Sequence, residues 1–367
     1  MGNKNLRDLS APYLAMIAIN FVFAVVNVLL KLVLQEGMDH SVLITYRLFV
    51  SAAFLAPIGY FRERGGDSKL TFRVLCYLLS SSFGVSLTQY LFLYGLERTS
   101  PTFAMGFVNM VPVITFLMAL PLRMETVDLI GSGGRAKILG SMVCISGAMT
   151  MIIYRGRTLF NPQEQQSLPL VTDGRKGGGG WIISSMSLLL GTIAWSSWFL
   201  IQNNIGMMYP RKYSSTAIVS SFAAAQSAVV SFLLSGRETK LSVWILKGQI
   251  EIITVLFSGM VGSGLCYVGM SWCVKKRGPL FTSAFSPLIQ IMAAMIDIPF
   301  LHDQLHLGSL LGSLLVIVGL YIMLWGKSRD INDHEVAAEG RDTDKASQQT
   351  RTEGPTAGTG PMITSEV

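Results

Sequence analysis

Hydrophobic residues are gathered into long runs along the chain, and polar residues separate one run from the next. Each run holds about 20 residues, enough for an α-helix to cross the hydrocarbon core of a bilayer. Ten such runs are visible, at roughly 11–34, 42–61, 74–94, 101–121, 137–154, 181–203, 214–235, 252–273, 280–300 and 307–326. The pattern therefore predicts an all-α polytopic membrane protein with ten transmembrane helices.

The composition supports this interpretation and excludes soluble classes of protein. Half of the residues are hydrophobic and only 14% are charged, against about 25% in a typical soluble domain. The net charge of +7 does not indicate nucleic-acid binding, because the Lys and Arg residues lie in short connections beside the runs, where they set orientation in the membrane. We therefore expect contact with a lipid bilayer and no nucleic-acid partner.

The placement of basic residues predicts that both termini are cytoplasmic. Lys4 and Arg7 precede the first run, whereas the next connection carries Glu36 and Asp39. The even-numbered connections that follow are basic as well, which fits the positive-inside rule. The connection over 155–180 also carries basic residues, although the number of runs places it on the far side. Its length and its run of glycines are typical of a flexible linker.

Five runs lie on each side of this linker, so the second half must enter the membrane from the side opposite to the first. The two halves are therefore expected to be inverted five-helix repeats. The segment after the last run is rich in polar and small residues and cannot bury a core. The predicted domains are a first repeat at 1–155, a non-cytoplasmic linker at 156–180, a second repeat at 181–327 and a disordered cytoplasmic tail at 328–367.

An internal repeat is visible at the centre of the fourth and ninth runs. Aligning 102–107 with 280–285 places Asn109 opposite Pro287 and Pro112 opposite Gln290. A proline inside a membrane helix frees a backbone carbonyl, which protein or cavity water must then satisfy. Broken helices at matching points of two repeats indicate the central site of a transporter. The alternative is that the prolines only kink the helices and the amides only join neighbouring helices.

Other polar and aromatic residues inside the runs complete the predicted substrate site, because such residues are costly in a membrane. Besides the two amide–proline pairs, the candidates are Asn27, Lys31, Gln89, Trp195, Trp198, Gln202 and Tyr267. Lys31 is a candidate cation for a substrate carboxylate, or else it reaches the interface from the outer end of its helix. The aromatic residues offer stacking walls. Lys31 and Asp297 are identified as the only charges well inside the runs.

The last run of each half carries two glycines seven residues apart. These are Gly140 and Gly147 in the first half, and Gly312 and Gly319 in the second. The spacing puts small residues on one helix face, which predicts close helix–helix contact.

Nothing in the chain indicates an enzyme. There is no phosphate-binding glycine loop and no Gly-x-Ser-x-Gly elbow, and His302 and His306, four residues apart, fall in a predicted loop. The four cysteines lie in or at the edge of the runs, which indicates neither a disulfide framework nor a metal site. We therefore expect no enzymatic activity, no metal and no cofactor.

Several motifs together resemble the plant drug/metabolite exporters, also called the walls-are-thin-related or nodulin-21-like family. They are Gly95-Leu-Glu-Arg-Thr-Ser-Pro-Thr-Phe103, Asn109-Met-Val-Pro-Val-Ile-Thr-Phe116, Arg123-Met-Glu125, Gln202 with Tyr209-Pro210, Trp272 with Gly278-Pro279, and Gly319-Leu-Tyr-Ile-Met-Leu-Trp-Gly-Lys327. The resemblance covers about 12–327 and implies two EamA-type repeats in a plant membrane. Family members export amino acids or move auxin out of the vacuole, so the resemblance implies a small organic solute without deciding which.

The first functional hypothesis is a secondary carrier or uniporter that exports small organic solutes, foremost amino acids, across the plasma membrane by alternating access. An alternative within the same fold is a transporter of auxin, other indoles or other plant metabolites in the tonoplast. A third hypothesis, from another class, is a membrane scaffold or receptor that works through its tail. The sequence leaves a homo-oligomer open.

Overall fold

The structure is a computed structural model, and it describes residues 2–64, 70–98, 101–125, 131–153, 178–234, 244–246, 248–301, 307, 311–312 and 314–329. Within these ranges the regular elements are all helices. Most of the predicted linker, and the predicted tail from residue 330 onward, lie outside the described residues. The all-helical expectation is thus confirmed for the described part of the chain.

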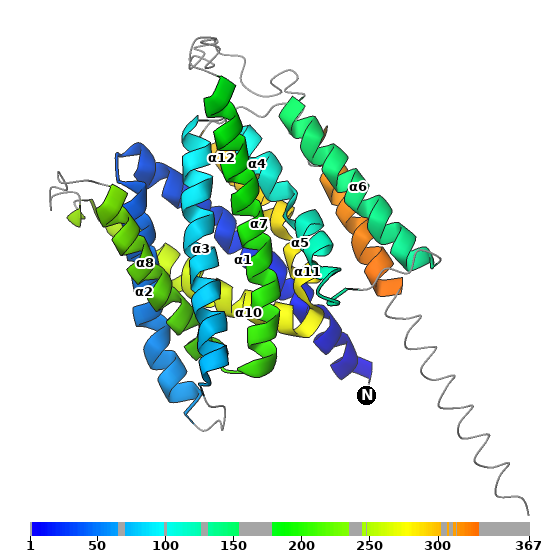
Figure 1. Cartoon of the computed structure of the whole chain (residues 1–367), viewed down its shortest axis with the longest axis horizontal. Coiled ribbons are helices and arrows are strands. Elements are labelled where there is room, and N and C mark those ends of the chain that lie inside the picture. The colour runs from blue at the N-terminus through cyan, green and yellow to red at the C-terminus, as the bar shows by residue number, and fades with distance from the viewer. Residues whose placement is uncertain are drawn as a thin grey trace, which may run out of the picture.

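The helices follow the hydrophobic runs and form one bundle, in which α3 and α7 lie side by side while α1 and α10 cross them at a large angle (Figure 1). The first half holds α1 (Gly2–Gln35), α2 (His40–Arg62), α3 (Phe72–Arg98), α4 (Pro101–Asn109), α5 (Val111–Ala119) and α6 (Ser132–Ile153). The second half holds α7 (Gly178–Met208), α8 (Lys212–Leu234), α9 (Gln249–Phe257), the π-helix η3 (Ser258–Leu265), α10 (Cys266–Arg277), α11 (Pro279–Ser283) and α12 (Ser286–Leu301). Residues 314–329 form the last helix.

Six of the described helical stretches are long and apolar enough to cross a membrane. They are Ser10–Leu34, His40–Arg62, Phe72–Gly95, Ile182–Met208, Lys212–Leu233 and Gln249–Arg277. The fourth and ninth predicted runs are each divided into two shorter helices, α4 with α5 and α11 with α12. The chain is therefore a polytopic helical membrane protein, while the count of ten spans stays a prediction.

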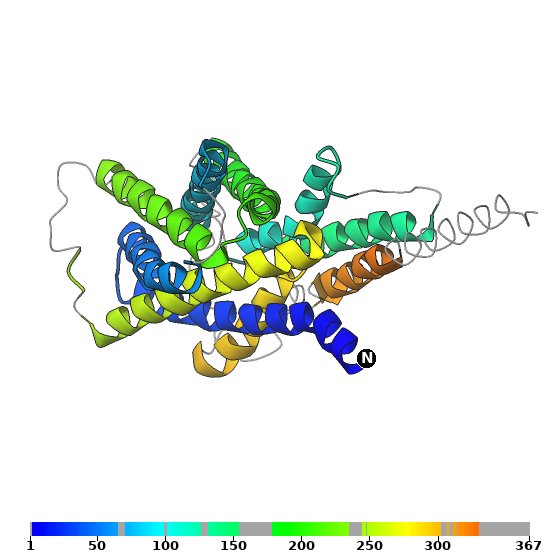
Figure 2. The same ribbon diagram turned by 90° about the horizontal axis from the view of Figure 1, so that it is seen from below.

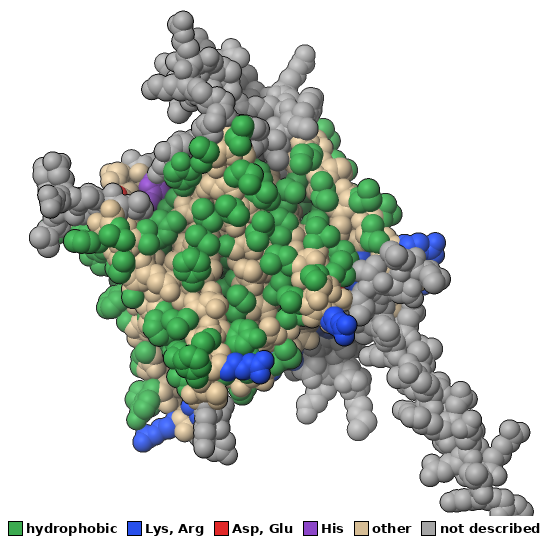
Figure 3. Space-filling model, viewed as in Figure 1, with side chains coloured by type: hydrophobic (Ala, Val, Ile, Leu, Met, Phe, Trp, Pro, Cys, Tyr) green, Lys and Arg blue, Asp and Glu red, His purple; other side chains and the backbone are tan. Residues whose placement is uncertain are grey.

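The outer surface of the bundle suits a lipid environment. Large apolar side chains cover the face shown in Figure 3, and Lys and Arg lie along its lower and right-hand margins. Phe232 and Leu233 are each 71% exposed. So much exposed apolar surface is unusual for a soluble monomer, and hydrocarbon is the solvent that matches it.

The two halves are interleaved instead of lying side by side as separate bodies. The first helix of the first half, α1, packs on α10 and α12 of the second half. The first helix of the second half, α7, packs reciprocally on α3 and α5 of the first half. The helices α2 and α8 also pack on each other. Figure 2 shows the bundle from below, with helices of the two halves crossing one another. Neither half can bury its apolar faces without the other.

The carboxylate of Glu63 joins the end of α2 to the start of α8. It accepts hydrogen bonds from the backbone N–H groups of Tyr213 at 3.0 Å and Ser214 at 2.9 Å, and from the Ser214 hydroxyl at 2.6 Å. A helix N-terminus carries partial positive charge and unpaired donors, so a carboxylate stabilises it. This contact links the two halves at one end of the bundle.

A buried ion cluster joins α6 to the last helix at the same end. Glu125 pairs with Lys327, and Lys137 lies 3.6 Å from the same carboxylate. Burial lowers the pKa of the Lys327 ammonium, and the neighbouring Glu125 opposes this shift. Removing one partner would leave a charge buried without compensation, which is much more costly than replacing the whole cluster.

The glycine faces of α6 and the last helix meet, as the seven-residue spacing predicts. A Cβ atom on Gly140 would lie 2.5 Å from the carbonyl oxygen of Gly319, and one on Gly147 would lie 2.9 Å from that of Gly312. The two helices run together at one side of the bundle (Figure 1). The prediction of close contact through these four glycines is confirmed.

We expect Gly140→Ala to lower stability, because its new methyl group would force the two backbones apart. Overpacking of this kind costs about 1–3 kcal/mol, measurable by thermal or denaturant unfolding in detergent. Gly84→Ala is the matched control, since its Cβ would meet only the Ala194 carbonyl oxygen at 3.8 Å. This control should keep or slightly raise stability, because Ala favours helix over Gly. Equal losses in both variants would contradict the contact.

Candidate functional site

The two prolines of the internal repeat break their helices in the same way. Helix α4 ends at Asn109, and α5 begins two residues later with Pro112 in its second position. Helix α11 ends at Ser283, and α12 begins at Ser286 with Pro287 in its second position. Proline lacks an N–H and fits only the first turn of a helix. Both prolines are buried, and the breaks lie inside the bundle.

Hydroxyl groups from α7 add hydrogen bonds to the backbone on either side of the first break. The Thr192 hydroxyl reaches the carbonyl oxygen of Phe107 at 3.4 Å, and the Ser196 hydroxyl reaches that of Val111 at 3.3 Å. Both hydroxyl-bearing side chains are fully buried. Lipid offers no such partner, so a broken helix at this depth depends on its protein neighbours.

The two amides of the internal repeat meet directly. The Asn109 side chain donates from Nδ2 to Oε1 of Gln290 at 2.9 Å. Asn109 is 1% exposed and Gln290 is only partly buried. The bond joins α4 to α12, and therefore one half of the chain to the other, beside both helix breaks. Such a bond fits a binding site as well as a simple link between helices.

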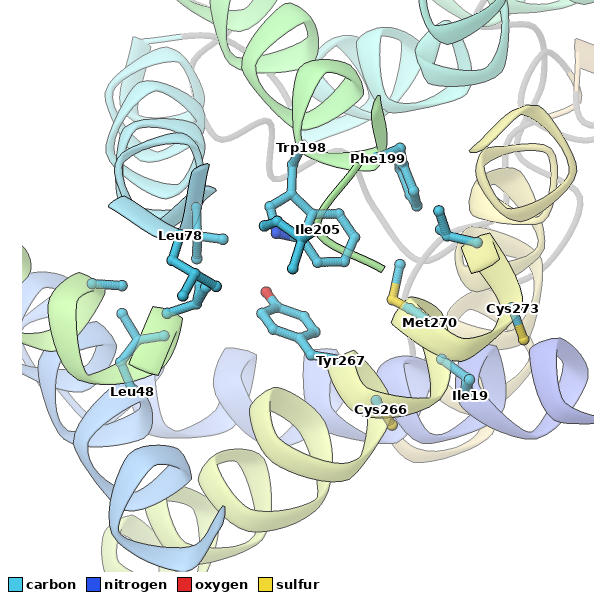
Figure 4. Close-up of a cluster of buried hydrophobic side chains, with 14 of the residues drawn as sticks. Ile19, Leu48, Leu78, Trp198, Phe199, Ile205, Cys266, Tyr267, Met270 and Cys273 are labelled. Carbon is cyan, nitrogen blue, oxygen red and sulfur yellow. The ribbon is translucent and has the colours of Figure 1, made fainter. Parts of the chain in front are cut away.

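A stacked aromatic wall stands beside this point. The rings of Trp195 and Trp198 are parallel within 6°, with their centroids 5.1 Å apart. Tyr267 of α10 extends toward Trp198, at a centroid distance of 5.6 Å (Figure 4). The buried Nε1 of Trp198 has no hydrogen-bond partner among the described residues. A donor left in this state is costly, which favours a site where an acceptor comes from a bound molecule.

The other candidates on α1 and α7 differ in their surroundings. Gln202 donates to the Ser271 hydroxyl at 2.7 Å, and Ser271 donates to the Tyr267 carbonyl oxygen at 2.7 Å. Gln202 thus ties α7 to the helix that carries Tyr267. On α1, Asn27 is exposed and Lys31 is half-buried. Among the described residues, no hydrogen bond joins Asn27 to Gln290.

Gln89 lies in a cavity together with a charged residue that the sequence analysis missed. The cavity has a volume of about 320 Å³ between α1, α2, α3 and α4, and its lining includes Leu30, Leu34, His40, Arg47, Gln89 and Phe92. The Arg47 guanidinium donates from Nη2 to Oε1 of Gln89 at 2.8 Å. The expectation that Lys31 and Asp297 are the only charges well inside the runs is therefore wrong.

The sequence did contain a signal for Arg47. It stands seven residues after His40, where α2 begins, and inside the apolar run at 42–61. A charge at that depth marks a functional site by default. The side chain of Asp297, the other charge considered, lies outside the described residues.

The other end of the bundle, where α2 finishes and α3 begins, is packed with hydrophobic side chains. Leu78 near the start of α3 and Ile205 near the end of α7 are almost completely buried. They belong to the same hydrophobic cluster as Tyr267 and Met270 of α10 (Figure 4). The Arg47 cavity lies toward the end where α1 finishes and α2 begins. The described site is thus hollow toward one end and packed toward the other.

Comparison with known proteins agrees with this architecture. Residues 10–153 match the EamA-like transporter family. The WAT1-related protein At3g30340 of Arabidopsis thaliana is 47% identical over 323 residues, which are 86% of this chain and 87% of that protein. The WAT1-related protein At4g01440 of the same plant is 41% identical over 320 residues, covering 87% of each chain.

One solved structure, described only as "Crystal structure of protein", superposes with a TM-score of 0.59 at 14% sequence identity. The match covers 84% of this chain and 98% of the other. At this identity the likeness concerns the fold alone. The relatives in Arabidopsis, by contrast, share more than a third of their residues over most of their length, and they are what decides the family. The chain belongs to the WAT1-related proteins of plants, which are EamA-type membrane transporters of the drug/metabolite transporter superfamily.

Proposed function

We propose that the protein is a secondary carrier or uniporter that exports small organic solutes, amino acids in the first place, by alternating access. The observation that carries this proposal is the Asn109–Gln290 bond at two proline-broken helices. Broken helices at matching points of two repeats are where secondary transporters place their central site. The cavity beside Arg47 gives that site an approach from one end.

The proposal includes ten transmembrane helices in two inverted repeats. Reciprocal packing supports it, since α1 lies on α10 and α12 while α7 lies on α3 and α5. The broken pairs α4–α5 and α11–α12 then each form one span of the membrane. In such an arrangement the two halves rock against each other around a fixed central site. The Asn109–Gln290 bond lies between the two parts that would move.

The proposed orientation places both termini in the cytoplasm. Among the described connections, Glu36 and Asp39 lie at the end of the bundle that holds the cavity. Arg62, Arg211 and Lys276 lie at the opposite end. The positive-inside rule assigns the basic end to the cytoplasm. The Arg47 cavity would then face outward, to the apoplast in a plasma membrane, which is the proposed location.

A second candidate is transport of auxin or a related indole, with the tonoplast as its membrane. The parallel rings of Trp195 and Trp198, with Tyr267 beside them, favour it. Offset stacking on such rings stabilises a flat aromatic solute by about 0.5–1.5 kcal/mol beyond simple burial. A scaffold or receptor would require neither this wall nor the amide pair.

The residues that we propose to bind the solute are Asn27, Lys31, Gln89, Asn109, Pro112, Trp195, Trp198, Gln202, Tyr267, Pro287 and Gln290.

A radiolabelled efflux screen tests the function directly. Oocytes or vesicles that contain the protein are loaded with amino acids or indole-3-acetate, and we expect loss of at least one of these solutes above an empty control. Deletion of residues 330–367 should preserve that efflux, because the proposed site lies entirely in the helices. Efflux that disappears with the tail, at normal expression, would favour the receptor or scaffold instead.

The amide pair can be tested by Asn109→Leu and Gln290→Leu. Each removes a partly buried hydrogen bond across the two halves, at a cost of about 1–3 kcal/mol where the remaining group loses its partner, so transport should weaken roughly tenfold or more. Efflux and detergent melting are measured on the same samples. Gln226→Leu is the matched control, because Gln226 donates to Ser82 between α8 and α3 at 3.1 Å, away from the site.

The control is expected to lower the melting temperature slightly and to leave apparent solute affinity unchanged. Interhelical bonds in membrane proteins average about 0.6 kcal/mol. If Asn109→Leu and Gln290→Leu behave like the control, with normal affinity and reduced melting temperature, the pair is only a link between helices.

Orientation is checked by cysteine labelling in intact cells. Among the four cysteines Cys76 is exposed and the other three are buried, so Cys76→Ser gives the background. A cysteine at Glu36 should react with a membrane-impermeant maleimide from outside. One at Arg73, which is also exposed, should react only after permeabilisation. The reverse result would invert the proposed topology.

A further inference from the structure

We propose that Arg47, held in place by Gln89, binds the carboxylate of the transported solute. The solute class would be a small organic monocarboxylate with an apolar or aromatic body. This inference deepens the proposed transport function and rests on it. It replaces Lys31 by Arg47 as the main cation of the site, and it concerns the cavity between α1, α2, α3 and α4.

The position of Arg47 is the first step. It lies in α2, one of the six helices able to span a membrane, and it points a permanent positive charge into the bundle. Charges in a span are rare and are usually paired or functional. Of the carboxylates that the structure describes, none forms an ion pair with Arg47. A negative charge that belongs to a ligand would complete the site.

The hydrogen-bond donors point to the same chemistry. Arg47 uses Nη2 to reach Oε1 of Gln89, while its buried Nε has no acceptor among the described residues. The buried Nε2 of Gln89 is likewise without an acceptor there. Two neighbouring donors without acceptors are costly. A carboxylate carries about four lone-pair positions on two oxygens and accepts a bidentate guanidinium, so it can satisfy both groups at once.

The rest of the cavity defines the body of the solute. Its wall beyond Arg47, Gln89 and His40 is mainly apolar, with Leu30, Leu43 and Phe92 among the lining residues. The volume of about 320 Å³ is at the small end of the usual range for ligand pockets, about 300–1,000 Å³. Such a space suits one small molecule with a charged end and an apolar remainder.

The aromatic wall continues on the helix that follows η3. Tyr267 is the second residue of α10, directly after η3, and it packs against Trp198. Gly259 of η3 lies against α2 beside Arg47. A Cβ on Gly259 would be 2.9 Å from the Arg47 carbonyl oxygen and 2.7 Å from Val50 Cβ. The close packing of η3 on α2 thus places Arg47 and Tyr267 on neighbouring elements.

The test compares each carboxylate with its neutral amide in transport by reconstituted vesicles. The probes are indole-3-acetate with indole-3-acetamide, and phenylalanine with phenylalaninamide. Wild-type protein should prefer the carboxylate of the pair that it transports. Arg47→Met should weaken apparent affinity for that carboxylate by about 10- to 100-fold, as expected for hydrogen bonds to a charged group, and leave the amide nearly unchanged.

Matched variants separate binding from structure. Arg47→Lys keeps the charge but loses the fork of donors, so it should retain part of the preference. Arg135→Met removes an exposed arginine of α6 that does not line the cavity, and should leave the preference intact. Thermal stabilisation of the purified protein by indole-3-acetate and by phenylalanine gives a binding readout that does not depend on transport. This thermal stabilisation should be lost in Arg47→Met and kept in Arg135→Met.

Every outcome decides the question. An unchanged preference in Arg47→Met, or an equal loss for carboxylate and amide, would overturn the inference and assign Arg47 a structural role. If Arg47→Met does not fold, Gln89→Leu takes its place and should reduce the preference several-fold, whereas no reduction would overturn the proposal. Wild-type transport of amides but not carboxylates would overturn this inference and leave the proposed export function standing. Neither transport nor binding of any probe would overturn both.

Discussion

Backbone groups freed by a proline inside a bilayer must find partners within the protein, and the centre of this structure follows from that constraint. Pro112 and Pro287 interrupt α4–α5 and α11–α12. At the first break, α7 brings the hydroxyls of Thr192 and Ser196 against the carbonyl oxygens of Phe107 and Val111. The interrupted helix thus has a close polar neighbour from the opposite half, in the region where we propose that a solute binds.

The interleaving of the two halves has the same physical origin. Each half supplies the first helix that packs against the other half's broken region, α7 on α5 and α1 on α12. Glu63 strengthens this exchange by capping the start of α8 from the end of α2. By contrast, α6 and the last helix contact each other through glycine faces. Close backbone contact there and polar contact at the centre would suit the proposed carrier, whose halves move against each other.

The proposed site is asymmetric along the bundle axis. Toward one end lie Arg47, Gln89 and the cavity, and toward the other lie Leu78 and Ile205 in close packing. Apolar packing of this kind excludes water and ions, and it can open without breaking a hydrogen bond or an ion pair. Alternating access would require that packing to open while the cavity closes. The Asn109–Gln290 bond and the Trp195–Trp198 stack lie between these regions.

The sequence alone predicts the class of fold, both helix breaks and the contact of the glycine faces, because hydrophobic length, proline and glycine act locally on the backbone. It also singled out Asn109 and Gln290, although not that they touch. The tertiary structure was needed to show that Arg47 reaches Gln89, that η3 packs against α2, and that hydroxyls 85 residues away contact the backbone around the break after Asn109. A single arginine near the start of an apolar run is the same local signal whether its head reaches water or a buried partner, and the packing of distant helices determines which of these occurs.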